Sequence, residues 1–479
     1  MDDLVFASVQ KLAETIRNRH VSATEVLDAH LAQIDRHNPR LNVIVTLNRD
    51  EARVRASQAD AALARGELWG PLHGVPITIK DGFSTAGIRT TSGFPLRADH
   101  VPEVDAPVVK RLRTAGAILL GKTNLPILSM DAQADNPIFG RTNNPWNLSR
   151  TSGGSTGGAA AVAAGLTSLE LGSDIGGSLR IPAHCCGIYS LKPSAYRLPG
   201  GGYHPNPEPA LPDIGGPAQV GVFGPLARSV DDLALAFYIM AGADPHSWAV
   251  PPVPVEPMPV LKLEKLRLAW IDDFGGVPVC AEIRAVLAHL VEELGRQGCD
   301  IQRYVPASFN FVTVWETWGE LLAVAMGQNP YLVASFVGSD NLETPISRGI
   351  SSGVQLTLPE YFTSLRKRSQ LITTLEVFFQ EWDALICPVM AVPAFPHCAQ
   401  NTPILVDGQL VDYSTALLSY TCPFNLSGHP VVVLPAANSR EGLPIGLQVV
   451  GRRWGEGRLL AIAKTLSQVT EGYQRPPGY

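Results

Sequence analysis

Apolar residues recur at helical spacing at the start of the chain and again beyond residue 280. Ser22 and Glu25 form a capping-box pattern, and the apolar residues that follow lie on one face of a predicted helix. Residues 51–65 are also predicted to be helical. The helix predicted for 281–297 has an apolar face made of Ile283, Val286, Leu287, Leu290, Val291 and Leu294. Further helices are predicted for residues 105–115, 159–166, 311–338, 354–381 and 458–469.

Short apolar runs bounded by Gly or Pro predict strands between these helices. One run, residues 74–80, ends at Lys80. Strands predicted for 266–271 and 300–305 enclose the helix at 281–297, which makes a β-α-β unit and favours an α/β fold. Other strands are predicted for residues 117–122, 431–435 and 445–450. The proline-rich stretch 245–260 is predicted to be a connection, because proline extends neither a helix nor a central strand.

The composition is that of a globular protein with a large interior. Of the 479 residues, 45% are hydrophobic and 17% are charged, which excludes a disordered chain. The net charge is −6 without a long run of either sign, which argues against nucleic acid as a partner. The acidic start lacks a signal-peptide pattern, and no apolar run reaches about 18 residues. We therefore expect a cytoplasmic protein with no membrane span.

The seven cysteines are scattered and odd in number, which predicts reduced and mostly buried thiols. A metal site would need a Cys-x-x-Cys or His-x-x-x-His spacing, and neither occurs. The nearest approaches are His184-Cys185-Cys186 and His397-Cys398. We expect no metal and no cofactor.

Residues 151–193 hold two serines, Ser155 and Ser178, each preceded by two glycines. Glycine permits turns that point backbone amides and hydroxyl groups at one small volume, as acyl transfer requires of a nucleophile beside an oxyanion hole. Ser155 also fits the Gly-x-Ser-x-Gly pattern of a nucleophile elbow. The elbow needs a strand before the serine, and residues 143–152 are predicted to be a loop, so the match is weak.

The same block contains longer motifs. They are Gly153-Gly-Ser-Thr-Gly-Gly158, Gly172-Ser-Asp-Ile-Gly-Gly-Ser-Leu-Arg-Ile-Pro182 and Cys186-Gly-Ile-Tyr-Ser-Leu-Lys-Pro193. With collinear matches at 74–81, 121–124, 140–145, 224–230 and 423–430, the chain resembles the amidase signature family. The resemblance implies that family's fold, a large mixed, mostly central β-sheet flanked on both faces by helices. It implies a single amidase domain over 1–479, with a helical region 1–65, a signature core 66–245 and a second part 246–479 that supplies substrate-pocket elements.

Carried over residue by residue, the resemblance implies a Ser–cis-Ser–Lys triad. Ser178 matches the nucleophile, and Lys80 matches the base. Ser155 matches the bridging serine, which is reached through a cis peptide bond from Gly154. The residues whose amides match the oxyanion hole are Ile175, Gly176, Gly177 and Ser178.

Lys80 has to be neutral to act as a base. The ordinary lysine pKa of about 10.4 must fall to about 7–8 for this, and burial among apolar neighbours such as Ile77 and Ile79 lowers it. Asp81 would oppose the change if it faced Lys80. Adjacent side chains of a strand point to opposite faces, so we expect Asp81 to face away from the site.

Other residues near the motifs admit a functional or a structural interpretation. Thr156 stands where many members of the family have a second serine, but the bridging role falls on Ser155. Met130 lies where the family lines its acyl pocket and is a candidate substrate contact, with core packing as the alternative. Asp174 and Arg180 are expected to brace the loop as a pair. Core packing is the safer interpretation of Trp315, Trp318, Met326 and Phe336.

The resemblance implies an amidohydrolase that cleaves linear carboxamides through an acyl-enzyme on Ser178, with a small-molecule amide as substrate. His429 has no role in such a triad and is expected to be structural. The long apolar segment 311–338 favours a roomy hydrophobic acyl site. Two other functions stay open: a glutaminase-type subunit of an amidotransferase complex, and a non-catalytic binding protein that keeps the fold. The N-terminal helices raise the hypothesis of a homodimer.

Overall fold

A mixed β-sheet of eleven strands forms the centre of the computed structural model, which describes residues 2–204, 220–245, 247–306, 309–327 and 344–479. The strand order is β1-β3-β2-β6-β8-β7-β14-β15-β11-β9-β10. Neighbours are parallel at β3-β2-β6 and at β11-β9-β10 and antiparallel elsewhere. The strands are β1 (Ile44–Leu47), β2 (Pro76–Lys80), β3 (Ile118–Thr123), β6 (Leu169–Asp174), β7 (Tyr189–Lys192), β8 (Val222–Ala227), β9 (Arg267–Trp270), β10 (Asp300–Arg303), β11 (Ala384–Pro388), β14 (Val431–Asn438) and β15 (Pro444–Val450).

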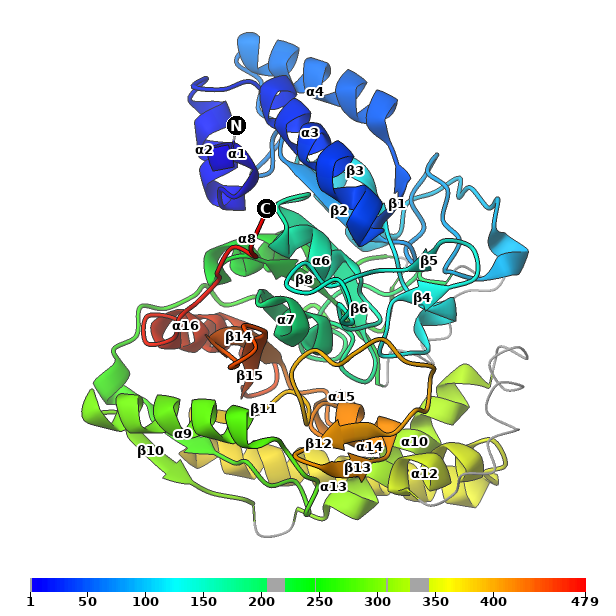
Figure 1. Ribbon diagram of the computed structural model, residues 1–479, viewed down its shortest axis with the longest axis vertical. Helices are drawn as coiled ribbons and strands as arrows, with labels where there is room; N and C mark the ends of the chain where they lie inside the picture. The colour runs from blue at the N-terminus through cyan, green and yellow to red at the C-terminus, as the bar shows by residue number, and fades with distance from the viewer. Residues whose placement is uncertain (1, 205–219, 246, 307–308, 328–343) are drawn as a thin grey trace.

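The N-terminal helices gather at one end of the molecule, drawn in blue in Figure 1. They are α1 (Asp2–Val5), α2 (Val9–Arg17), α3 (Ala23–Leu41) and α4 (Arg49–Ala64). α3 begins at the predicted capping box, in which the Glu25 N–H donates to Ser22 Oγ at 3.0 Å and the Ser22 N–H donates to Glu25 Oε2 at 2.8 Å. The apolar face of α3 is buried. α3 and α4 contact each other, α3 also contacts β2, and α4 also contacts β3.

Helices pack along the length of the sheet. α6 (Gly158–Ala163) contacts β2, β6 and β8, and α7 (Arg180–Cys186) contacts β7, β14 and β15. α8 (Val230–Met240) contacts β7, β8 and α5 (Pro107–Thr114), while α16 (Glu456–Leu466) contacts β14 and β15. α9 (Ala281–Arg296) connects the parallel strands β9 and β10, as the predicted β-α-β unit required. The expected α/β fold with a large mixed sheet flanked by helices is therefore confirmed.

A second group of helices stands beside the sheet. It comprises α10 (Phe311–Met326), α12 (Pro345–Gly353), α13 (Leu358–Glu381), α14 (Tyr413–Leu418) and α15 (Cys422–Leu426). α10 contacts α12, α13 and α15. The approach of α12 to α10 needs glycine, because a Cβ on Gly349 would collide with the carbonyl group of Glu316. Two small hairpins complete the described part: β4 (Asp135–Asn136) with β5 (Gly140–Arg141), and β12 (Ile404–Val406) with β13 (Gln409–Val411).

Several predicted boundaries differ from the structure. The helix predicted for 354–381 begins only at Leu358, where the Thr357 N–H donates to Glu360 Oε2 at 2.8 Å and caps the first turn. The helix predicted for 311–338 is observed as α10, and Phe336 lies outside the described residues. The strands β1, β6, β7, β8 and β11 were not predicted, because each has only four to six residues and periodicity over so short a run does not separate a strand from a helical segment. Residues 251–262 form neither helix nor strand, which agrees with a proline-rich connection.

Candidate active site

Lys80 is the last residue of β2, and its side chain is fully buried. Its Nζ lies 2.6 Å from Ser155 Oγ and 2.9 Å from Ser173 Oγ. Burial lowers the pKa of Lys80 to about 7, against the opposing attraction of Asp174 and Glu170. A substantial fraction of Lys80 is therefore neutral near pH 7, as a general base has to be.

Ser155 is buried at the point where the chain enters α6. The peptide bond between Gly154 and Ser155 is cis, as the resemblance implied. No side chain fits at Gly154, since a Cβ there would lie 2.6 Å from backbone atoms of Ala132 and Gln133. The segment 131–133 thus packs directly against the backbone that presents Ser155 to Lys80.

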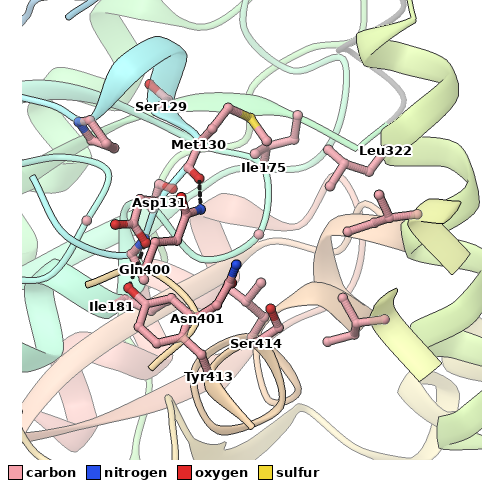
Figure 2. A pocket seen from close by; sticks show the side chains of 18 of the residues that line it. Ser129, Met130, Asp131, Ile175, Ile181, Leu322, Gln400, Asn401, Tyr413 and Ser414 are labelled. Carbon is pink, nitrogen blue, oxygen red and sulfur yellow. Dashed lines mark hydrogen bonds between the residues drawn. The ribbon is translucent and has the colours of Figure 1, made fainter. Parts of the chain in front are cut away.

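Ser178 lies between β6 and α7 and lines a cavity of about 600 Å³ (Figure 2). Gly154, Ile175 and Gly176 line the same cavity, whereas Lys80 and Ser155 are fully buried. Ser178 retains 8% exposure. A molecule in the cavity therefore meets Ser178, while the base is kept out of contact with solvent.

The loop that carries Ser178 is held by the carboxylate of Asp174. The Gly177 N–H donates to Asp174 Oδ1 at 2.9 Å, and the Leu179 N–H donates to Oδ2 at 3.0 Å. Arg180 donates through Nε and Nη2 to the two oxygens of the same carboxylate, at 3.0 and 2.9 Å. The expected bracing pair of Asp174 and Arg180 is confirmed, and both side chains are fully buried.

This loop corrects one of the predicted oxyanion donors. Gly177 was expected to contribute its amide, but that N–H already donates to Asp174 and is not available to a ligand. The N–H groups of Ile175, Gly176 and Ser178 have no acceptor among the described residues. These three amides remain candidate oxyanion donors.

The cavity has an apolar side and a polar side. In Figure 2, Asp131, Gln400 and Tyr413 lie together across the cavity from Leu322. The apolar residues of the lining include Ile175, Trp318, Leu322, Ile346, Ile350 and Leu418. The polar residues of the lining are Ser129, Asp131, Asp135, Ser178, Ser347, Gln400, Asn401, Asp412, Tyr413 and Ser414. Met130 lines the cavity with Ser178, which agrees with its candidate role as a substrate contact.

Most of these lining residues were not predicted from the sequence. Trp318 was assigned to the core, but it lines the cavity and its indole Nε1 donates to the Ile175 carbonyl at 3.0 Å. Trp315 and Met326 are buried and do not line the cavity, as expected. Asp131, Gln400 and Tyr413 had no signal in the sequence, because they come together only through packing of segments far apart in the chain.

The histidines and cysteines near the motifs have structural roles. His184 contacts the carbonyl groups of Gly446 and Val392, both at 3.1 Å, and does not line the cavity. Burial lowers the pKa of His429 to about 4, and this ring lies beside Glu376 away from the cavity. All seven cysteines are free thiols. In the described ranges we find no cluster of His, Cys, Asp and Glu with the arrangement of a metal site.

No helix in the described part of the chain has both the length and the apolar character needed to cross a lipid bilayer.

Comparison with known proteins places this geometry in a family. The family model Amidase matches residues 25–460. The chain is 34% identical to indoleacetamide hydrolase of Bradyrhizobium diazoefficiens, over 95% of this chain and 84% of the relative. It is 32% identical to a glutamyl-tRNA(Gln) amidotransferase subunit of Geobacillus stearothermophilus, over 98% of each. Among solved structures, 6-aminohexanoate cyclic dimer hydrolase matches with a TM-score of 0.82 and 26% identity over 99% of both chains.

Proposed function

This chain belongs to the amidase family, and from that premise we propose that it hydrolyses linear carboxamides through an acyl-enzyme on Ser178. The products are a carboxylate and either ammonia or an amine. One observation carries the proposal: Nζ of a buried lysine, Lys80, lies 2.6 Å from Oγ of Ser155, and Ser155 follows Gly154, which lines the cavity together with Ser178. A neutral lysine in that position supplies the base that a serine hydroxyl needs to become a nucleophile.

The chemistry has two halves. In the first, Ser178 Oγ attacks the amide carbonyl, and its proton passes through the Ser155 hydroxyl to Lys80. The C–N bond then breaks as the proton returns along the same path to the departing nitrogen, which leaves an ester on Ser178. In the second half, water attacks this ester, gives its proton to the same relay, and releases the carboxylate and a free Ser178.

The negative charge on the carbonyl oxygen needs donors that are already in position. The amides of Ile175, Gly176 and Ser178 are suited to this role, because they have no other acceptor in the described part of the chain. Asp174 supports them indirectly by holding the neighbouring amides of Gly177 and Leu179. Loss of one such donor typically reduces the rate by about 10²–10³-fold.

A second candidate is a glutaminase-type subunit of an amidotransferase complex, which the similarity to the glutamyl-tRNA(Gln) amidotransferase protein supports. The charges of the cavity favour the first candidate. Glutamine carries an α-carboxylate that needs a cationic partner, and no Lys, Arg or His is among the described residues that line the cavity. Three aspartates line it instead, Asp131, Asp135 and Asp412. Hydrolysis of amides by the isolated chain, with no release of ammonia from glutamine, would decide between the two.

Other parts of the proposal concern partners and location. The substrate is a small-molecule amide, and nucleic acid is not a partner, in keeping with the net charge of −6. A homodimer through the N-terminal helices and a cytoplasmic location complete the proposal. Light scattering of the purified protein tests the dimer through its mass.

The experiment that tests the function is labelling with a fluorophosphonate, followed by assay on a small panel of carboxamides. The wild type is expected to be labelled and active, and Ser178→Ala is expected to lose both. Ser414→Ala is the matched control, since Ser414 lines the same cavity but lies on α14, outside the loop that carries Ser178. Labelling is expected to persist in this control. An unlabelled wild type that hydrolyses no amide would indicate a non-catalytic binding protein instead.

A further inference from the structure

Asp131 differs from the other carboxylates of the cavity in having neither a cation nor a helix N-terminus to compensate its charge. Asp135 accepts a hydrogen bond from Arg141 Nε at 3.0 Å, which balances its charge. Asp412 accepts bonds from the Thr415 N–H and hydroxyl at 2.8 and 2.9 Å and so caps α14. No Lys, Arg or His pairs with Asp131 in the described part of the chain.

The hydrogen bonds of Asp131 hold one carboxylate oxygen and leave the other unused. Oδ1 accepts from the Tyr413 hydroxyl at 2.6 Å and from the Ala132 N–H at 2.7 Å (Figure 2). Oδ2 has no donor among the described residues, and the side chain lines the cavity. The carboxylate is thus fixed in orientation, with one oxygen available to a bound molecule.

Asp131 packs against the segment that carries the proposed proton relay. Its backbone packs on Gly154, where a Cβ would lie 2.9 Å from the Asp131 carbonyl oxygen. The preceding residue, Met130, is held by Gln400, whose Nε2 donates to the Met130 carbonyl at 3.0 Å. Asp131 therefore belongs to the wall next to Gly154 and the proposed proton relay Ser155, in the same cavity as Ser178.

A carboxylate in such a place is costly unless a positive group compensates it. Burial raises the pKa of Asp131 to about 6, so that the group is charged above neutral pH. The described residues that line the cavity include no cation, and the charges of the other two carboxylates are compensated by Arg141 and by the N-terminus of α14. An ammonium group of the substrate would supply both the missing charge and the missing donor to Oδ2.

We propose that Asp131 binds a protonated amine of the substrate, so that the preferred substrates are carboxamides that carry an ammonium group. Their apolar part then faces α10 and α12 across the cavity, against Leu322, Ile346 and Ile350. This inference rests on the proposed amide hydrolysis and names its substrate class. Hydrogen bonds between charged groups are strong enough for an advantage of about ten- to a hundredfold over a neutral analogue.

The test compares kcat/KM for amides in which only the ammonium group is exchanged for a methyl group. One pair is phenylalaninamide and 2-methyl-3-phenylpropanamide, and the other is 6-aminohexanamide and heptanamide. The wild type is expected to favour the ammonium member of at least one pair by about tenfold or more. Asp131→Asn, which keeps an acceptor for Tyr413 and Ala132, is expected to remove this preference while the rate on the neutral member changes only a few-fold.

Asp135→Asn is the matched control. It removes a charge from the same cavity wall, but Arg141 already balances that charge. Its preference for the ammonium member is expected to persist. A wild type that favours the methyl member of both pairs overturns the inference, as does an Asp131→Asn variant that slows both members equally. If the inference fails but the wild type hydrolyses the neutral members and Ser178→Ala does not, the proposed function still holds. Failure to hydrolyse any member overturns the proposed function and this inference with it.

Discussion

The carboxylate of Asp81 lies 4.0 Å from Nζ of Lys122, although Asp81 follows Lys80 directly in the chain. It also accepts a bond from the Thr91 N–H at 3.0 Å. The expectation that Asp81 faces away from the site is therefore confirmed. Two buried lysines on neighbouring strands thus have different partners. Lys122 lies beside a carboxylate, whereas the described hydrogen bonds of the Lys80 side chain go to serine hydroxyl groups.

This difference predicts the pH dependence of the enzyme. Lys80 acts as a base only when neutral, and its pKa is lowered to about 7 by burial. We expect kcat/KM for a neutral amide to rise with pH and to level off above about pH 7. Lys80→Met should reduce kcat/KM by about 10²–10⁴-fold. Asp81→Asn should leave the pH midpoint of this rise in kcat/KM unchanged. A midpoint that shifted in this variant would show that Asp81 acts on the base.

Lys122 is predicted to matter for stability and not for the base. Its Nζ donates to the Phe83 carbonyl at 2.5 Å and to the hydroxyl groups of Thr85 and Thr90, both at 2.9 Å. Lys122→Met would leave the buried Asp81 without its cation, and we expect a loss of about 3–5 kcal/mol in the free energy of unfolding. Urea denaturation measures this loss. The double variant Lys122→Met/Asp81→Asn should recover part of it, and a full loss in the double variant would mean that the pair does not interact.

The pair of Asp174 and Arg180 is predicted to support both stability and catalysis. Burial alone raises the pKa of Asp174, but the Arg180 guanidinium outweighs it and holds this pKa well below the usual range. Arg180→Met leaves a buried charge unpaired and should cost about 3–5 kcal/mol in the free energy of unfolding. It should also lower kcat, since the loop that presents Ser178 loses its anchor. A variant with normal stability and kcat would contradict this role.

Gly154 is predicted to tolerate no side chain. A Cβ there would lie 2.6 Å from the backbone of Ala132 and Gln133, so Gly154→Ala must displace either that segment or Ser155. We expect loss of amide hydrolysis and a lower melting temperature. The control is Gly295→Ala on α9, where a Cβ meets nothing within 4 Å. This control should raise the free energy of unfolding by about 0.5–1 kcal/mol, because alanine is the better helix former.

Much of this architecture follows from local pattern. The spacing of apolar residues identified α3, α9 and the β-α-β unit, because a helix or a strand that buries one face repeats with its own period. Alternation along β2 placed Asp81 opposite Lys80. The family resemblance that the motifs carry indicated Lys80, Ser155 and Ser178 as one group, and the structure brings Lys80 and Ser155 into contact.

Tertiary packing decided the rest. The Gly177 amide is engaged because Asp174 folds back onto the loop, a contact that no spacing rule predicts. The polar side of the cavity joins Asp131 to Tyr413 across 282 positions and Met130 to Gln400 across 270. Periodicity records only which face of an element is buried, and it does not record which distant element covers that face. The sequence by itself therefore determined most of the helices and the candidate triad, whereas the folded chain decided which amides are available and which carboxylate of the cavity has no compensating group.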